Sequence, residues 1–547
     1  MVPSGHRDTF ARDSLPPPEQ WPDFIFDLTE LQYPDRLNCV TELVDKWVAS
    51  GQGGRTCIVS PHGTLTYMQL AERVDRIANV LTRDLGMVPG NRVLLRAPNT
   101  PALIAACLAV VKSGGVMVAT MPLLRAKELS YIVRKAKIEL ALCDAQLAEE
   151  MEKTQEQACG LKRVVYWGEG GADSLETLMR RPGYETFAAC DTAIDDVCLI
   201  GFTSGTTGEP KGTVHFHRDM LAICDTYGRH VLQASPDDRF ICSAPIAFTF
   251  GLGAHMLFPF RIGAASIQIE KASPGSLLQE IARYDATVCF TAPTAYRAML
   301  PYVAEHGIAT LRKCVSGGEA LPRATFEAWQ KATGLKIVEG MGGTEMMHNF
   351  LGSPEAEVRP GVTGRVVPGY IARVVDEKGN EMPRGVVGRL AVKGPTGCRY
   401  LNDPRQKKYV RDGWNFPGDT VLQDEDGYFH YQARSDDMIV SAGYNIAAPE
   451  VEEVLMVHPA VAECGVVGCP DPERGQIVKA FIVLRPGFSG DAALTRTLQE
   501  HVKASVAPYK YPRSIDYVAS LPRTQTGKLQ RVELRRRELP DIKEAAS

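Results

Sequence analysis

Cysteine, basic charge and long apolar runs are all scarce in this sequence. The 14 cysteines are thinly spread over 547 residues and none forms a C-x-x-C pair, which excludes a disulfide scaffold and indicates reduced thiols. The formal net charge is -4, so the chain lacks the basic excess typical of nucleic-acid-binding proteins. Composition therefore favours an ordinary globular protein with several core-bearing units.

Apolar runs are also short. The longest, PALIAACLAVV at 101–111, falls well below the roughly 20 residues needed to span a bilayer, so we expect a buried helix there. The first residues are polar and rich in proline, unlike a signal peptide. We expect a cytoplasmic protein without an integral membrane segment.

Hydrophobic periodicity predicts an α/β fold. Helix-spaced segments alternate with short apolar strands, which indicates layered parallel α/β subdomains. The glycine- and proline-punctuated stretch at 361–422 is typical of a small antiparallel β subdomain. We predict an N-terminal domain at 1–435 and a small, mobile α+β lid domain at 436–547. The strands expected in the first domain lie at 92–95, 115–119, 197–201, 240–243, 266–269, 287–290 and 313–316. In the lid we expect helices at 448–458 and 492–505 and strands at 462–468, 479–484 and 514–517.

A glycine-rich loop, TSGTTGEPKG at 203–212, directly follows an apolar strand. Its glycines allow successive backbone N–H groups to converge on an anion, and its hydroxyl groups and lysine add further donors. The string does not satisfy the Walker pattern G-x-x-x-x-G-K-[ST]. We therefore predict a different phosphate-binding loop, leading into a helix.

This loop resembles the signature of the adenylate-forming superfamily of acyl- and aryl-CoA synthetases, and further motifs follow in the family's order. The resemblance implies that ATP is bound by Thr203, Ser204, Gly205, Thr206, Thr207 and Gly208, with Lys211 contributing to catalysis. SGGEAL at 316–321 resembles the adenine turn, with Gly317, Gly318 and Glu319 against the purine.

EGMGGTE at 339–345 resembles the next family motif, with Met341 where a tyrosine is usual. It implies nucleotide contacts from Glu339, Gly340 and Met341, a phosphate contact from Thr344 and a Mg²⁺ ligand in Glu345, whose carboxylate suits this hard cation. Similarity further implies that Asp419 binds the ribose, that Arg434 lies near ribose and phosphate, that Asp436 is the interdomain hinge, and that Lys528 is the catalytic lysine of adenylation.

The implied reaction has two steps, in which a carboxylate and MgATP give an acyl-adenylate and coenzyme A then displaces AMP. Gly443, Tyr444 and Asn445 would meet the pantetheine arm of CoA. A catalytically dead nucleotide-binding regulator is the alternative from another class. A homodimer and acetylation of Lys528, which would remove its charge, are additional hypotheses.

Two short sequence motifs indicate which carboxylic acid is the substrate. FTFGLG at 248–253 and TEMMHNF at 344–350 resemble the benzoate and 2-aminobenzoate CoA ligase branch. By this similarity the acyl pocket is formed by Phe248, Thr249, Phe250, Gly251, His348 and Asn349. Phe250 offers an apolar ring face, and Thr249 and Asn349 offer hydrogen bonds to a polar substituent. The alternative substrate is a small aliphatic acid, such as a 2-hydroxy or short branched acid.

Overall fold

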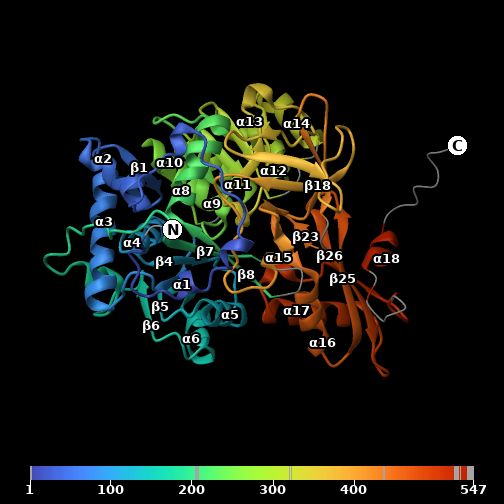
Figure 1. Cartoon of the computed structure of the whole chain (residues 1–547). Helices are drawn as coiled ribbons and strands as arrows, with labels where there is room; N and C mark the ends of the chain where they lie inside the picture. The colour runs from blue at the N-terminus through green and yellow to red at the C-terminus, as the bar shows by residue number, and fades with distance from the viewer. Residues whose placement is uncertain are drawn as a thin grey trace. The chain divides into compact units, whose positions relative to one another are not determined.

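The computed structural model describes residues 3–203, 209–270, 272–318, 321, 323–434, 438–522, 529 and 531–538 (Figure 1). The chain divides into two compact units. The first comprises Met1–Pro122, Leu129–Phe202 and Gly212–Ala433, and the second comprises Leu123–Glu128, Thr203–Lys211 and Arg434–Ser547.

One sheet of the first unit has the strand order β6-β5-β3-β4-β7-β8. Its strands are β3 (Arg92–Arg96), β4 (Val116–Thr120), β5 (Leu140–Asp144), β6 (Arg163–Trp167), β7 (Val197–Thr203) and β8 (Lys211–Phe216). Helices α3 (Tyr67–Asn79) and α4 (Pro101–Lys112) pack against each other (Figure 1). Nearly all of α4 is buried, which confirms that the longest apolar run is a core helix.

A second sheet has the order β13-β12-β11-β9-β10-β1-β2, and its pairs are parallel except for β1 with β2. Because parallel strands end at one edge, the loops after β9, β11 and β12 gather there. The strands are β1 (Thr56–Ser60), β2 (Gly63–Thr66), β9 (Arg239–Cys242), β10 (Ala265–Ile267), β11 (Val288–Thr291), β12 (Lys313–Ser316) and β13 (Ile337–Val338).

Helices surround these sheets. Trp329 on α14 (Arg323–Thr333) and Tyr296 on α12 (Pro293–Met299) meet edge to face, with ring centroids 4.8 Å apart, in a core cluster that contains residues of the second sheet. The remaining α-helices of this part of the chain are α1 (Phe10–Asp13), α2 (Lys46–Ala49), α5 (Ala126–Ala136), α6 (Ala148–Gln157), α7 (Leu175–Met179), α8 (His217–Ile223), α9 (Thr249–Leu252), α10 (Phe258–Ile262), α11 (Pro274–Arg283), α13 (Val303–His306) and α15 (Gln406–Tyr409).

The region at 361–422 is antiparallel, as predicted. Its sheet has the order β19-β20-β18-β21-β22, with β17 paired to β18, and a separate sheet has the order β14-β15-β16. These strands are β14 (Gly340–Gly342), β15 (Asn349–Gly352), β16 (Arg365–Val366), β17 (Ile371–Val375), β18 (Gly388–Lys393), β19 (Val410–Arg411), β20 (Trp414–Asn415), β21 (Asp419–Gln423) and β22 (Phe429–Arg434).

The C-terminal part of the second unit is a small α+β body. A hairpin and a three-stranded sheet of order β25-β26-β27 pack with helices around a core that contains Val466, Ile482 and Leu498. The elements are β23 (Met438–Ser441), β24 (Tyr444–Ala447), α16 (Ala448–Val457), β25 (Val461–Asp471), β26 (Gly475–Leu484), α17 (Ala492–Ser505), β27 (Ser514–Tyr517) and α18 (Arg531–Arg536). Each element predicted for this region is present.

Candidate functional site

The predicted phosphate loop runs between two strands. Thr203 ends β7 and Lys211 begins β8, whereas the sequence had indicated a helix directly after the loop. That prediction was wrong, because residues 211–216 form β8, which lies beside β7 in the sheet and also bonds to a distant segment: Val214 N donates to Arg399 O and Leu401 N donates to Gly212 O, both at 2.8 Å. Helix α8 begins only at His217. Ser204, Gly205, Thr206, Thr207 and Gly208 lie outside the described residues.

The predicted adenine turn follows β12. A Cβ atom on Gly317 would lie 2.4 Å from Cε2 of Phe250, so the phenyl ring lies directly against this glycine. Gly318 has φ +88°, a left-handed conformation that glycine adopts without strain. Glu319 lies outside the described residues. The turn and Phe250, from two different predicted subsites, are therefore in contact.

Glu339 ties the next motif to this turn. Its Oε1 accepts a hydrogen bond from Leu321 N at 2.9 Å, and burial raises the pKa of the carboxyl to about 7. Gly340 and Met341 form β14 and pair with Gly352 and Leu351 of β15.

Thr344 and Glu345 lie in a short 3₁₀ turn, Thr344–Met346. A Cβ on Gly201 of β7 would lie 3.0 Å from the Thr344 methyl group, so this turn abuts the strand that leads to the phosphate loop. The Tyr400 hydroxyl donates to Glu345 Oε1 at 2.5 Å. This contact orients the Glu345 carboxylate, the residue predicted to hold Mg²⁺.

Asp419 is buried at the start of β21. Arg434 ends β22, but its side chain is outside the described set, as are all of Asp436 and Lys528. The roles expected for these residues remain predictions.

The described residues fit MgATP. The buried Thr203 Oγ1, beside the phosphate loop, has no hydrogen-bond partner among the described residues, which is a donor available to phosphate. Glu345 supplies an oriented carboxylate of the kind that Mg²⁺ prefers. Gly317 lacks the side chain that would overlap the Phe250 ring, so the turn and the ring can lie in contact.

The predicted acyl-pocket residues cluster around one buried ring. Phe250 stacks on His348, with centroids 5.9 Å apart and an interplanar angle of 12°. Phe258 meets the same imidazole edge to face at 4.8 Å, and Tyr227 lies at 4.9 Å. Thr249 is buried beside Phe250 in α9, which follows Phe248. Gly251 is required because a Cβ there would lie 2.1 Å from Pro245 O.

His348 is 2% exposed, and neither ring nitrogen has a hydrogen-bond partner among the described residues. Burial lowers its pKa to about 3, so the ring is neutral at physiological pH. The neighbouring Asn349 is also buried, and its side chain lies over Gly340 and Gly342, where added Cβ atoms would approach it to 2.5 and 2.6 Å. Asn349, predicted for the acyl pocket, therefore packs against the glycines of the predicted nucleotide motif.

Tyr227 and Phe258 belong to this cluster although no sequence motif indicated them. Burial raises the pKa of the Tyr227 hydroxyl, and the neighbouring Asn349 side chain offsets part of that rise. Both residues lie in helical segments whose apolar spacing is typical of any core. Only the three-dimensional contact with His348 distinguishes them.

The predicted CoA loop is a hairpin turn in the second unit. Ala442 and Gly443 link β23 to β24 and have φ +48° and +81°, the two positive values of a type I′ turn. Tyr444 stacks on Tyr509 with centroids 4.2 Å apart. The Asn445 side chain is outside the described set.

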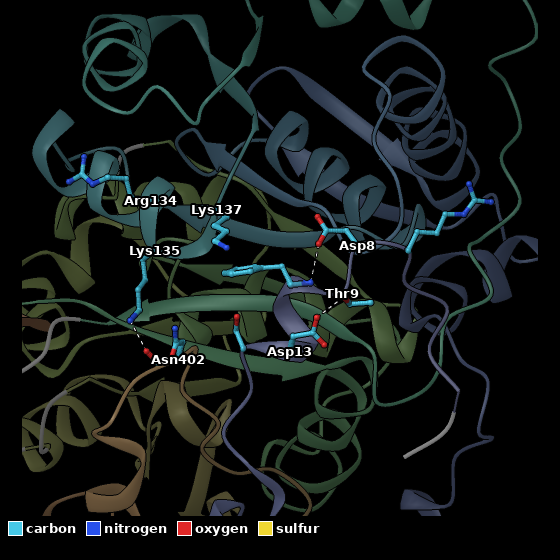
Figure 2. Close-up of a pocket in the computed structure, with 10 residues that line it drawn as sticks. Asp8, Thr9, Asp13, Arg134, Lys135, Lys137 and Asn402 are labelled. Carbon is cyan, nitrogen blue, oxygen red and sulfur yellow. Dashed lines mark hydrogen bonds between the residues drawn. The ribbon is translucent and has the colours of Figure 1, made fainter.

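A hollow of about 820 Å³ lies elsewhere in the first unit (Figure 2). In Figure 2, Lys135 Nζ donates to Asn402 O at 2.9 Å and the Thr9 hydroxyl donates to Asp13 at 2.6 Å. None of the residues predicted for the nucleotide, acid or CoA sites lines this hollow. The lining residues are Arg7, Asp8, Thr9, Phe10, Asp13, Ser14, Arg134, Lys135, Lys137 and Asn402.

Cys39, Cys198 and His217 form a buried cluster that spacing along the chain did not reveal. Their ligand atoms lie within 4.8 Å of one another. His217 Nδ1 accepts from the backbone N–H of Cys39 at 3.1 Å, which accounts for the position of the imidazole.

Within the described part of the chain, no helix combines the length and the apolar character needed to cross a bilayer.

Comparisons with known proteins agree with this geometry. Residues 45–399 match the family model of the AMP-binding enzymes, and residues 450–528 match that of the AMP-binding enzyme C-terminal domain. The chain is 36% identical to benzoate–CoA ligase of Thauera aromatica, over 92% of this chain and 97% of the relative. It is 32% identical to the mitochondrial acyl-coenzyme A synthetase ACSM3 of Rattus norvegicus, over 93% and 92% of the two chains.

Among solved structures, the anthranilate CoA ligase AuaEII in complex with anthranoyl-AMP is similar, with a TM-score of 0.73 and 32% identity. The match covers 93% of this chain and 99% of that one.

Proposed function

The chain belongs to the AMP-binding enzyme family and is an AMP-forming acid–CoA ligase, and from this premise we propose that it activates an aromatic acid, such as 2-aminobenzoate or benzoate, with a polar ortho substituent preferred. Enzymes of this family use ATP, Mg²⁺ and CoA. The specific acid is our proposal.

The observation that carries it is the environment of His348. The ring is buried among Tyr227, Phe250 and Phe258, yet neither nitrogen has a partner among the described residues. An unsatisfied buried polar group costs about 1–3 kcal/mol. A substrate that offers both an aromatic face and a hydrogen-bonding substituent would recover that cost.

The neutral state of His348 supports a neutral substituent. With a pKa of about 3, the imidazole carries one N–H donor and one acceptor nitrogen. An aromatic amine can accept from the one or donate to the other. Asn349 and Thr249 supply further donors and acceptors from adjacent positions, while the Phe250 ring offers an apolar surface to the substrate ring.

In the proposed first step, a carboxylate oxygen attacks the α-phosphorus of ATP, and pyrophosphate leaves. Lys211, Thr344 and Lys528 would stabilise the charge that develops on the phosphoryl oxygens. Mg²⁺, held by Glu345, would neutralise phosphate charge. Asp419 would hold the ribose hydroxyls, and no protein nucleophile is required.

In the proposed second step, the CoA thiolate attacks the acyl carbon and AMP leaves, with the hairpin turn at Gly443 and Tyr444 guiding the pantetheine arm. The chain would act as two domains, at 1–435 and 436–547, with the hinge at Asp436.

Pyrophosphate exchange tests the acid. We expect exchange with 2-aminobenzoate to exceed exchange with benzoate, and both to exceed exchange with short 2-hydroxy acids. Asn349→Leu keeps the side-chain size but removes the amide, so the preference for 2-aminobenzoate over benzoate should fall about 10-fold. Benzoate turnover by the same variant is the internal control. Exchange with aliphatic acids only would refute the proposal and favour the small-acid alternative.

A further inference from the structure

We propose that His215 is a positioning residue for adenylation, because its ring holds the backbone of Thr344 in register with the strand that leaves the phosphate loop. This inference rests on the roles proposed above for Thr344 and Glu345. His215 belongs to none of the motifs that identify the site, and it would touch neither ATP nor the acid.

The contact is direct and buried. His215 lies in β8, is fully buried, and its Nε2 is 2.7 Å from Thr344 O. A carbonyl oxygen can only accept, so Nε2 carries the proton. Nδ1 lies 3.4 Å from Asp219 Oδ2 but has no hydrogen-bond partner among the described residues. The ring therefore lies between the first turn of α8 and the turn that contains Thr344, and it is hydrogen-bonded to the latter.

The carboxylate of Asp219, against which the other side of the ring lies, is fixed in place. Asp219 accepts a hydrogen bond from Phe216 N at 3.0 Å and forms an ion pair with the fully buried Arg399. Breaking a buried ion pair is strongly unfavourable, so the Asp219 carboxylate is held rigidly beside the His215 ring. Arg399 in turn is attached to β8 through Val214 on both its backbone and its side chain.

The segment that contains Arg399 also contacts Glu345, the second residue of the Thr344–Met346 turn. Tyr400, next to Arg399, donates to Glu345 at 2.5 Å, and Leu401 N donates to Gly212 O at 2.8 Å. His215 thus holds the Thr344 backbone while Tyr400 holds the Glu345 carboxylate, and both supports are attached to the strand at 211–216. A displacement of about 1 Å at such a site can cost about 100-fold in rate.

A leucine at this position would fill the space of the imidazole but make no hydrogen bond. We expect His215→Leu to lower kcat of adenylation at least about 30-fold, measured by pyrophosphate exchange, with the KM for the acid changed less than about 3-fold. Thiolysis of supplied acyl-adenylate, which transfers no phosphoryl group, should be unchanged.

Glutamine tests the hydrogen bond itself, because its Nε2 can occupy the place of the imidazole Nε2. His215→Gln should restore adenylation to within about 5-fold of the wild-type protein. His217→Leu is the matched control: it removes an equally buried histidine that faces Cys39 instead of Thr344. It should lower the melting temperature but leave adenylation kcat per folded molecule unchanged.

Equal loss of both half-reactions in His215→Leu would overturn the proposal, as would a His215→Gln variant no better than leucine. These outcomes are separable from failure of the proposed substrate. If the wild-type protein exchanges pyrophosphate only with a non-aromatic acid, the aromatic assignment fails, and the His215 variants are compared with that acid.

Discussion

Replacing Glu339 with glutamine should change the pH dependence of stability. Glutamine retains an oxygen to accept from Leu321 N, the contact that Glu339 makes at 2.9 Å, but it cannot ionise. Burial raises the Glu339 pKa from an ordinary value of 4.5 to about 7. That difference corresponds to about 3 kcal/mol between the two protonation states, as an upper estimate.

The sign of this stability difference depends on whether the carboxyl ionises first in the folded or in the unfolded chain. Below pH 4.5 the carboxyl is protonated in both the folded and unfolded chains, and glutamine should have little effect. Between pH 4.5 and 7 the unfolded chain loses its proton first, so the wild-type protein loses stability relative to Glu339→Gln. Above pH 7 the difference should remain constant at its maximum.

Denaturant unfolding of the ligand-free proteins at pH 4.5, 6 and 8 measures this difference. Glu327→Gln on the exposed surface of α14 is the matched control and should change stability by less than about 0.5 kcal/mol throughout. Parallel curves for wild type and Glu339→Gln from pH 4.5 to 8 would refute the reasoning.

Further substitutions test the other parts of the site. Lys528→Ala should abolish adenylate formation but leave thiolysis of supplied adenylate intact, and equal loss of both half-reactions would contradict its assigned role. Tyr400→Phe removes the hydrogen bond to Glu345 and should raise the Mg²⁺ concentration for half-maximal adenylation about 10-fold; an unchanged Mg²⁺ curve would show that Tyr400 does not orient this carboxylate. Gly317→Ala introduces a Cβ 2.4 Å from the Phe250 ring and should raise the KM for both ATP and acid. Phe250→Leu in the same chain relieves the overlap and should partly reverse the effect on the KM for ATP, but not on the KM for the acid, whose ring Phe250 is proposed to contact.

Much of the architecture follows from local patterns. The strands β9, β11 and β12 and the C-terminal helices α16 and α17 occur within one or two residues of their predicted ranges. Apolar patterns predict such elements because a buried strand or helix carries the apolar pattern in its own residues, whichever segments cover it. The antiparallel region after Gly361 was predictable from its glycine and proline spacing.

The strand after the phosphate loop was not predictable in this way. Val214 and Phe216 of β8 are buried. The strand lies beside β7 in its sheet, and it also bonds to Arg399 and Leu401, almost two hundred residues further along the chain. Tertiary pairing determines this strand, and the helix was predicted one turn too early. The contact between His215 and Thr344 depends on the same long-range pairing.

In the predicted acid-binding pocket, too, some residues could be predicted from the sequence and others could not. Phe250, His348 and Asn349 were identified because they lie inside motif-like strings, and the structure brings them together. Tyr227 and Phe258 complete the surroundings of His348 from helices with no distinguishing pattern. The buried grouping of Cys39, Cys198 and His217 likewise joins segments whose spacing indicates no common site.

A crystal structure of the protein with bound 2-aminobenzoate or its adenylate tests the central claim most directly. We expect the substrate ring to lie against Phe250, with its amino group within about 3.2 Å of His348 or Asn349. Binding of the aromatic ring away from both residues, with His348 still lacking a hydrogen-bond partner, would contradict the proposed basis of substrate choice.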